Sequence, residues 1–159
     1  MSNVNNNIVD IDISTKKKKR VRFDGDDNRA VELDTTDMNV VTRLNESIPK
    51  IDEITRDAAD ITAGLDVDKE DTMTYVSIVS EKMKEADSKI RGIIDYIFGA
   101  PVCDAAVPYG TMFDVIEDTY MYDYLMGALI KLYETSIVEG YNKIINRMES
   151  HTKKYTKKR

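Results

Sequence analysis

The stretch of sequence that decides the fold covers residues 76–99 and reads VSIVSEKMKEADSKIRGIIDYIFG. Its apolar side chains recur at alternating steps of three and four residues, which places them on one face of an α-helix. Acidic residues at 68–71 precede this face, where the helix dipole favours negative charge. Gly99, followed by Pro101, supplies a C-terminal stop. The pattern predicts one continuous helix over residues 71–98. The apolar stripe is Val76, Val79, Met83, Ala86, Ile90, Ile93 and Ile97.

A second helical period precedes this segment, over residues 36–64. Apolar residues repeat there at steps of three and four, and Thr36 or Asp37 can cap the helix. Pro49 lies inside the run and has no amide hydrogen to donate. We therefore expect a kink or a break in this helix near Ser47.

A third helix is expected over residues 119–150, after a loop over residues 100–110 and a short turn over residues 111–114. Its periodic apolar side chains are expected to pack against the stripe of the 71–98 helix and so to close a bundle. The side chains expected to be buried are Met121, Leu125, Ala128, Leu132, Ile137, Tyr141, Ile144 and Met148.

The N-terminal part of the chain has the pattern of short strands and turns. Apolar and acidic side chains alternate over residues 8–13, which predicts a short strand. Residues 21–23 and 30–33 flank a turn-rich stretch over residues 24–29. This arrangement predicts a β-hairpin, which is marginal alone and needs to pack on the helices.

Together these patterns predict a mainly α fold, namely a small helical bundle of about three to four helices with a short N-terminal β element and disordered basic ends. The expected division is a disordered or weakly stranded arm over residues 1–20, a helical domain with the hairpin over residues 21–150, and a basic disordered tail over residues 151–159. A chain of 159 residues has enough apolar material for one core.

The composition excludes most common catalytic sites. Cys103 is the single cysteine and His151 the single histidine. An internal disulfide and a cysteine-based zinc site are therefore excluded, and the usual Ser-His, Cys-His and multi-histidine metal arrangements are not expected. Cys103 is expected to be a buried or incidental thiol. No apolar run approaches the roughly 20 residues of a membrane span, and no signal peptide opens the chain. We expect a non-enzymatic, intracellular binding or assembly protein without cofactor or metal.

One acidic constellation supports an enzymatic alternative. Asp114 and Glu117 are spaced i, i+3, and Glu81 with Glu85 offers a second acidic pair. Paired carboxylates on facing helices hold magnesium in all-α nucleotide pyrophosphohydrolases. Both pairs also fit a solvated helix face, which is the interpretation that the amphipathic pattern favours.

Charge is distributed unevenly along the chain. Residues 1–23 carry a net +4, residues 24–139 a net −16 and residues 140–159 a net +6, for an overall charge of −6. The acidic body makes non-specific binding of nucleic acid by the core unfavourable, because phosphates would be repelled. The basic ends fit solubilising tails, contact with an acidic protein, or contact with nucleic acid.

The order of features in the second half of the chain resembles that of a known protein family. The segment Ile90-Arg91-Gly92-Ile93-Ile94-Asp95-Tyr96-Ile97-Phe98-Gly99 closes an amphipathic helix, a loop and a second long helix follow, and the chain ends in Tyr155-Thr156-Lys157-Lys158-Arg159. This order is similar to that of the tail assembly chaperone-like proteins of long-tailed bacteriophages of Gram-positive hosts. The resemblance covers about residues 70–159 and, more weakly, the Val-x-Phe-Asp start at residues 21–24.

The resemblance implies a non-enzymatic helper in the host cytoplasm that coats the tape-measure protein before the tail tube polymerises around it. It implies as partners the tape-measure protein or other phage tail proteins, with a homo-oligomer as a further state and no membrane. The contact surface expected from it is the exposed face of the last helix with the loop before it. Its residues are Tyr109, Phe113, Tyr120, Tyr122 and Met126. Tyrosine and methionine are favoured on adaptable interfaces.

Two other functions remain open from the sequence. One is a structural or connector protein that is retained in the phage particle. The other is a small nucleic-acid-associated protein that acts through its basic ends.

Overall fold

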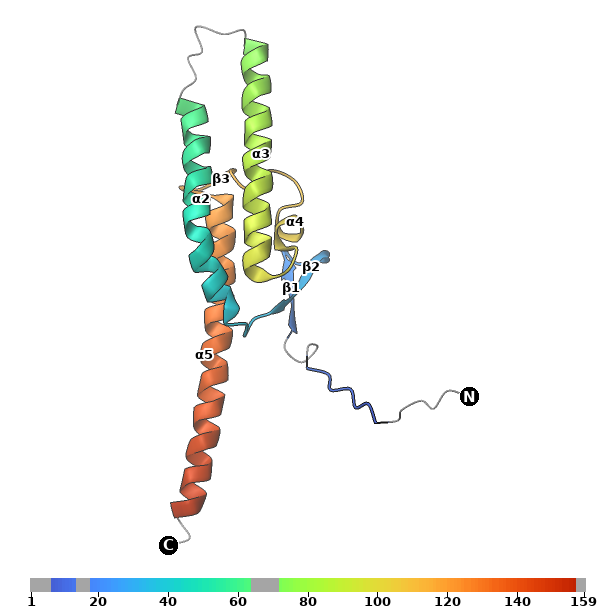
Figure 1. Ribbon diagram of the computed structural model, residues 1–159, viewed down its shortest axis with the longest axis vertical. Helices are drawn as coiled ribbons and strands as arrows, with labels where there is room; N and C mark the ends of the chain where they lie inside the picture. Colours follow the sequence, from blue (N-terminus) through green and yellow to red (C-terminus); the bar gives the residue numbers. More distant parts are fainter. Residues whose placement is uncertain (1–6, 14–17, 64–71, 157–159) are drawn as a thin grey trace, which may run out of the picture.

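The computed structural model describes residues 7–13, 18–63 and 72–156 (Figure 1). Within these ranges it has four helices and two small antiparallel sheets, which confirms the expected mainly α fold with a short N-terminal β element. The elements in chain order are β1 Lys18–Phe23, β2 Asp26–Asp34, α2 Asn39–Ala63, α3 Thr72–Phe98, α4 Val102–Ala106, β3 Val115–Ile116, β4 Thr119–Tyr120 and α5 Met121–Thr156.

Helix α3 is the continuous helix that its apolar period predicts, and it begins at Thr72. Its main partner is α2, which lies alongside it (Figure 1), rather than α5 as expected. Ile90, Ile94 and Ile97 are fully buried, whereas Val76, at the far end of the stripe, is exposed. The stripe is therefore buried only where the rest of the fold surrounds the second half of α3.

Helix α2 runs through Pro49, so of the kink or break expected near Ser47 the break is not formed. Its N-terminus is held by Asp37, which accepts a hydrogen bond from the Asn39 amide (2.9 Å) and pairs with Arg43 (2.8 Å). Burial acts to raise the pKa of Asp37, but the hydrogen bonds from Arg43 and Asn39 outweigh it, so this pKa lies below its usual value. Arg43 also donates to the Ile97 carbonyl (2.9 Å), which ties the start of α2 to the end of α3.

The hairpin of β1 and β2 is confirmed, with a tighter turn than expected. Asp24 and Gly25 both have positive φ (52° and 71°), as the two central residues of a type I′ turn require. Val31 and Leu33 of β2 are buried in the core. Strand β1 begins at Lys18, so the boundary expected at residues 20 and 21 falls inside a strand.

The strand expected over residues 8–13 is not formed. Its four large apolar side chains are 58% to 82% exposed, and this arm extends away from the body in Figure 1. An isolated strand has no partner for its backbone groups, so alternation alone does not create one. The first residues of the arm, 1–6, lie outside the described ranges.

The segment expected to be a plain loop over residues 100–110 contains helix α4. Val102, Cys103 and Val107 are buried there, and Arg29 of β2 donates to the carbonyls of Ala105 (2.9 Å) and Ala106. The expected turn at residues 111–114 is formed by hydrogen bonds between Thr111 and Asp114. This connection is therefore part of the core.

Helix α5 has 36 residues, and its two parts have different surroundings. In the proximal segment, residues 121–136, the core-facing side chains are buried, whereas residues 141–150 of the distal segment, 137–156, are exposed throughout. The expected burial of Tyr141, Ile144 and Met148 is therefore wrong. At 1.5 Å per residue the distal segment is about 30 Å long, and it extends beyond the body in Figure 1.

The chain end also differs from expectation. The backbone is helical up to Thr156, so a disordered tail does not begin at residue 151. None of the described helices is long and apolar enough to cross a membrane.

Candidate functional site

The five residues expected to form the contact surface do not form one surface. Tyr109 is 91% exposed, Tyr120 is at the margin of exposure and Met126 is half-buried. Phe113 and Tyr122 are only 7% and 5% exposed. The last two are core residues, so the interpretation of them as exposed binding residues is wrong.

Phe113, Tyr120 and Tyr122 instead form an aromatic cluster at the start of α5. Their ring centroids are 5.7 to 5.8 Å apart, within the range of favourable aromatic pairs. The Tyr122 hydroxyl lies 2.9 Å from the Thr55 hydroxyl of α2. Burial raises the pKa of Tyr122 above its ordinary value, while the hydrogen bond to Thr55 acts to lower it. The cluster attaches α5 to α2, which is a structural role.

The residues before the cluster are held in place by Arg91 and Asp87 of α3. Arg91 pairs with Asp87 (3.0 Å) and Asp104 (3.1 Å) and donates to the carbonyls of Val107 and Gly110 (3.1 Å each). The other oxygen of Asp87 accepts the Met112 amide at 2.7 Å. A half-buried guanidinium with this many acceptors has a structural role, because each of its nitrogens donates a hydrogen bond within the fold.

Cys103 is buried, as the sequence predicts, in α4. Burial raises the pKa of its thiol far above the ordinary value, and Asp95, which also accepts the Cys103 amide (3.0 Å), adds to this effect. A thiol that stays protonated and buried is a poor nucleophile. Cys103 therefore fills space in the core.

The acidic residues weighed as a magnesium site are not assembled into one. Asp114 is occupied by hydrogen bonds to Thr111 (3.0 and 3.1 Å), and Glu85 pairs with Lys89 on its own helix (3.0 Å). In the part of the chain that the structure describes, no group of three or more histidine, cysteine, aspartate or glutamate residues could hold a metal ion.

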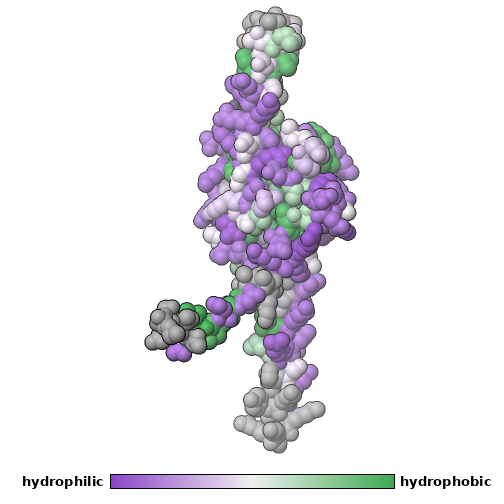
Figure 2. Space-filling view, turned by 90° about the vertical axis from the view of Figure 1, so that its right-hand side faces the viewer, coloured by the Kyte–Doolittle hydropathy of each residue, from purple (hydrophilic) through white to green (hydrophobic). Residues whose placement is uncertain are grey.

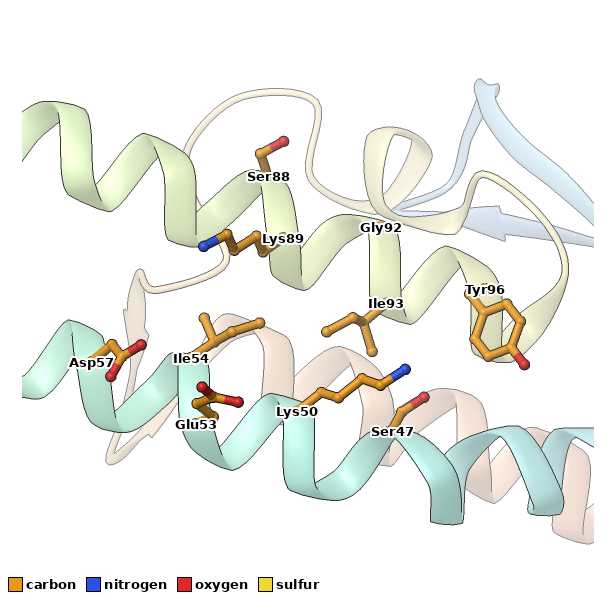
Figure 3. A pocket seen from close by; sticks show the side chains of 10 residues that line it. All are labelled: Ser47, Lys50, Glu53, Ile54, Asp57, Ser88, Lys89, Gly92, Ile93 and Tyr96. Carbon is orange, nitrogen blue, oxygen red and sulfur yellow. The ribbon is translucent and has the colours of Figure 1, made fainter.

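A groove of about 640 Å³ runs between α2 and α3 (Figure 3). Ile54 and Ile93 point toward each other at its floor, and charged side chains of both signs stand along its rims. The hydrogen bond that Lys89 donates to Glu85 raises the pKa of Lys89. The lining residues are Ser47, Lys50, Glu53, Ile54, Asp57, Ser88, Lys89, Gly92, Ile93 and Tyr96. No convergent set of polar groups marks this groove as a small-molecule site.

An exposed apolar surface lies on the distal segment of α5. We call it the distal apolar face, and Figure 2 shows apolar surface beside polar surface on this part of the molecule. Tyr141 and Ile144 are 60% and 56% exposed, and the other members are exposed to a similar degree. The face consists of Val138, Tyr141, Ile144, Ile145 and Met148. Steps of three and four residues place all five on one side of the helix.

The sequence contains a sign that burial ends within α5, and the prediction of one long buried stripe did not use it. The buried face of the proximal segment passes through Leu125, Leu129 and Ser136. Continuing it by steps of four and three residues leads to Lys143 and Arg147. Two basic residues cannot continue a buried face without partners. The core therefore ends at Ser136, whose hydroxyl accepts a hydrogen bond from Lys19 of β1 (3.3 Å).

The distal apolar face is thus the candidate functional site. Exposed apolar patches on otherwise polar proteins mark interaction sites. Comparisons with protein-family models, with curated proteins and with solved structures find no match to this chain.

Proposed function

We propose that this protein is a non-enzymatic bacteriophage tail assembly chaperone that binds the tape-measure protein during tail morphogenesis in the host cytoplasm. The single observation that carries the proposal is the distal apolar face of α5, an exposed row of five large apolar side chains on a projecting helix. The resemblance of residues 70–159 to such chaperones supplies the identity of the partner.

The chemistry of the face fits a helical partner. Val138 and Ile145 widen the row of Tyr141, Ile144 and Met148, so the apolar face is broader than a narrow two-helix seam. A helix with such a face lies along a groove or between helices of its partner. A tape-measure protein is expected to be a long amphipathic helix that aggregates when it is not covered. The acidic body of the chaperone then keeps the complex dispersed through charge repulsion.

The test is co-expression with the phage's tape-measure protein, followed by sedimentation. The wild-type chain should keep the tape-measure protein in the supernatant. Ile144→Asp places a charge in the centre of the exposed face, so it should leave the fold intact and abolish this effect. Asn146→Asp is the matched control, because it adds the same charge on the opposite side of the helix. It should behave as wild type.

The proposal fails if the wild-type chain leaves the tape-measure protein in the pellet, or if the two variants behave alike. Circular dichroism of both variants checks that folding is unchanged. Phe113 and Tyr122 are unsuitable for this test, because alanine at these buried positions would damage the core.

Two alternative functions make different predictions. A structural or connector protein would be abundant in purified mature virions by mass spectrometry, whereas a chaperone would be absent from them. A nucleic-acid-associated protein would bind DNA at physiological salt and lose this binding when the basic ends are deleted.

A further inference from the structure

A second exposed apolar element lies at the opposite end of the chain. In the arm over residues 8–13, Val9, Ile11 and Ile13 occupy alternate positions and Asp10 and Asp12 lie between them. The apolar side chains are exposed, and Figure 2 shows apolar surface on the arm where it leaves the body. A segment with this alternation has one apolar and one acidic face as soon as it pairs with another strand.

Strand β1 offers an edge for such pairing. The sheet has only β1 and β2, so among the described residues the outer edge of β1 has no strand partner. Val21 and Phe23 of β1 face the core, whereas Arg20 and Arg22 face solvent. Both arginines already contact Asp27, Arg20 through the carbonyl (3.0 Å) and Arg22 through the carboxylate (2.9 Å). Each guanidinium has further donors available for a second acceptor.

One antiparallel register matches both faces of the arm to β1. It places Asp12 opposite Arg20, Ile11 opposite Val21 and Asp10 opposite Arg22. Val9 then lies beside Phe23 on the core-facing side. Opposite charges and apolar pairs directly across from each other stabilise a sheet. A slip by one residue would place both aspartates on the core-facing side. A slip by two residues toward the start of β1 would still place Asp10 and Asp12 opposite basic residues, but it would move Ile11 from Val21 to Lys19. The register above is the one that places both aspartates opposite arginines and both Val9 and Ile11 opposite apolar side chains.

We propose that residues 8–13 of one copy add as a third strand to the outer edge of β1 in a second copy. Pairing within one copy in the same register would bring Lys16 and Lys17 into a tight connection next to Lys18 of β1, where the three charges repel. The arm also extends away from its own hairpin (Figure 1). Exchange of two arms produces a closed dimer with two-fold symmetry and covers both exposed edges.

Sedimentation velocity of the full chain with two charge-reversal variants tests this exchange. One variant is Asp10→Arg with Asp12→Arg, and the other is Arg20→Glu with Arg22→Glu. Each variant alone pairs like charges at both arms, so its dimer should dissociate roughly a hundredfold more readily than that of wild type. In a mixture of the two, every arm again meets an opposite charge, and dimers should reappear.

The control applies the same charge change away from the hairpin. Asp52→Arg with Glu53→Arg alters two exposed residues of α2 and should leave the dimer intact. A wild-type chain that remains monomeric at about 100 µM, a range typical of weak complexes, would overturn the proposal. So would a mixture that stays monomeric, or a control that dissociates as readily as the arm variant.

A second measurement remains decisive if the Arg20→Glu, Arg22→Glu chain does not fold. A chain with Ile11→Cys and Val21→Cys brings the two thiols opposite each other in the proposed register. Air oxidation should join two copies into a covalent dimer on a non-reducing gel. A product that is crosslinked only within one copy would overturn the exchange in favour of a folded-back arm.

Discussion

The proximal and distal segments of α5 belong to one uninterrupted helix and both carry large apolar side chains at helical spacing, yet only the proximal segment is part of the core. Leu125 and Leu129 are buried among the other elements, whereas Tyr141 and Ile144 are exposed. Tyr133 contacts Phe98 of α3 with ring centroids 5.5 Å apart, near the end of the buried part. The difference shows that apolar periodicity predicts an amphipathic helix, but it does not predict whether another element packs on the apolar face.

The strongest test of this difference between the proximal and distal segments is to place the same charge in each of them. Leu129→Asp should unfold the protein, because an unpaired carboxylate in the core costs several kcal/mol out of a total stability of roughly 5–15 kcal/mol. Ile144→Asp should change the free energy of unfolding by less than about 0.5 kcal/mol. Chemical denaturation followed by circular dichroism measures both. Equal effects of the two substitutions would show that the segments do not differ.

High pH provides a second test of the proximal segment. Burial raises the pKa of Tyr133 to about 12, above the value of 10.0 that it has when exposed. As the pH rises, the unfolded chain therefore releases this proton before the folded chain does. The contribution of this protonated hydroxyl to the free energy of unfolding is complete below pH 10 and is lost as the pH rises toward 12. The loss amounts to about 2 kcal/mol. Denaturation midpoints of wild type and Tyr133→Phe between pH 9 and 12 measure it, and the variant should lack this part of the decline.

At neutral pH the same substitution should stabilise the protein. The Tyr133 hydroxyl is buried and has no hydrogen-bond partner among the described residues. Removing an unsatisfied buried hydroxyl should raise the free energy of unfolding by about 1 kcal/mol. Tyr141→Phe is the control in the exposed segment and should change nothing measurable. A clear loss of stability in Tyr133→Phe would mean that the hydroxyl has a partner in solution.

Removing the distal segment should also have little effect on stability. A chain that ends at Ile137 lacks the distal apolar face but keeps the buried contacts of the proximal segment. Its free energy of unfolding should lie within about 1 kcal/mol of that of the full chain. Thermal and denaturant unfolding of the truncated chain measure this difference. A truncated chain that does not fold would place the distal segment in the folding core.

Much of the fold could be predicted from local pattern. The period of three and four residues located α3 to within one residue, and the turn-rich stretch between two apolar runs located the hairpin. Both features depend mainly on neighbouring residues, through helix periodicity and turn geometry. Of the kink or break expected at Pro49, the break is not formed, because α2 continues through this residue. A helix can tolerate the lost hydrogen bond where packing on both sides holds it.

The candidate site was harder to predict than the fold. Tyr109 and Phe113 are four residues apart in a similar composition, yet one is 91% exposed and the other is buried. This difference in exposure depends on Arg91 and Asp87, which hold residues 110–112 against α3. Such contacts join residues distant in sequence, and residue type alone does not reveal them. The basic pair Lys143 and Arg147 was the one local sign that burial ends within α5.

The sequence by itself determined the three long helices and the hairpin, because these follow from periodicity and turn chemistry. Only the tertiary structure decided which apolar faces are covered. Ile90 and Ile144 occupy similar positions on amphipathic helices, and the first is fully buried while the second is exposed. Burial is a property of the surrounding elements, so it is decided when distant segments pack and not by the helix that carries the side chain.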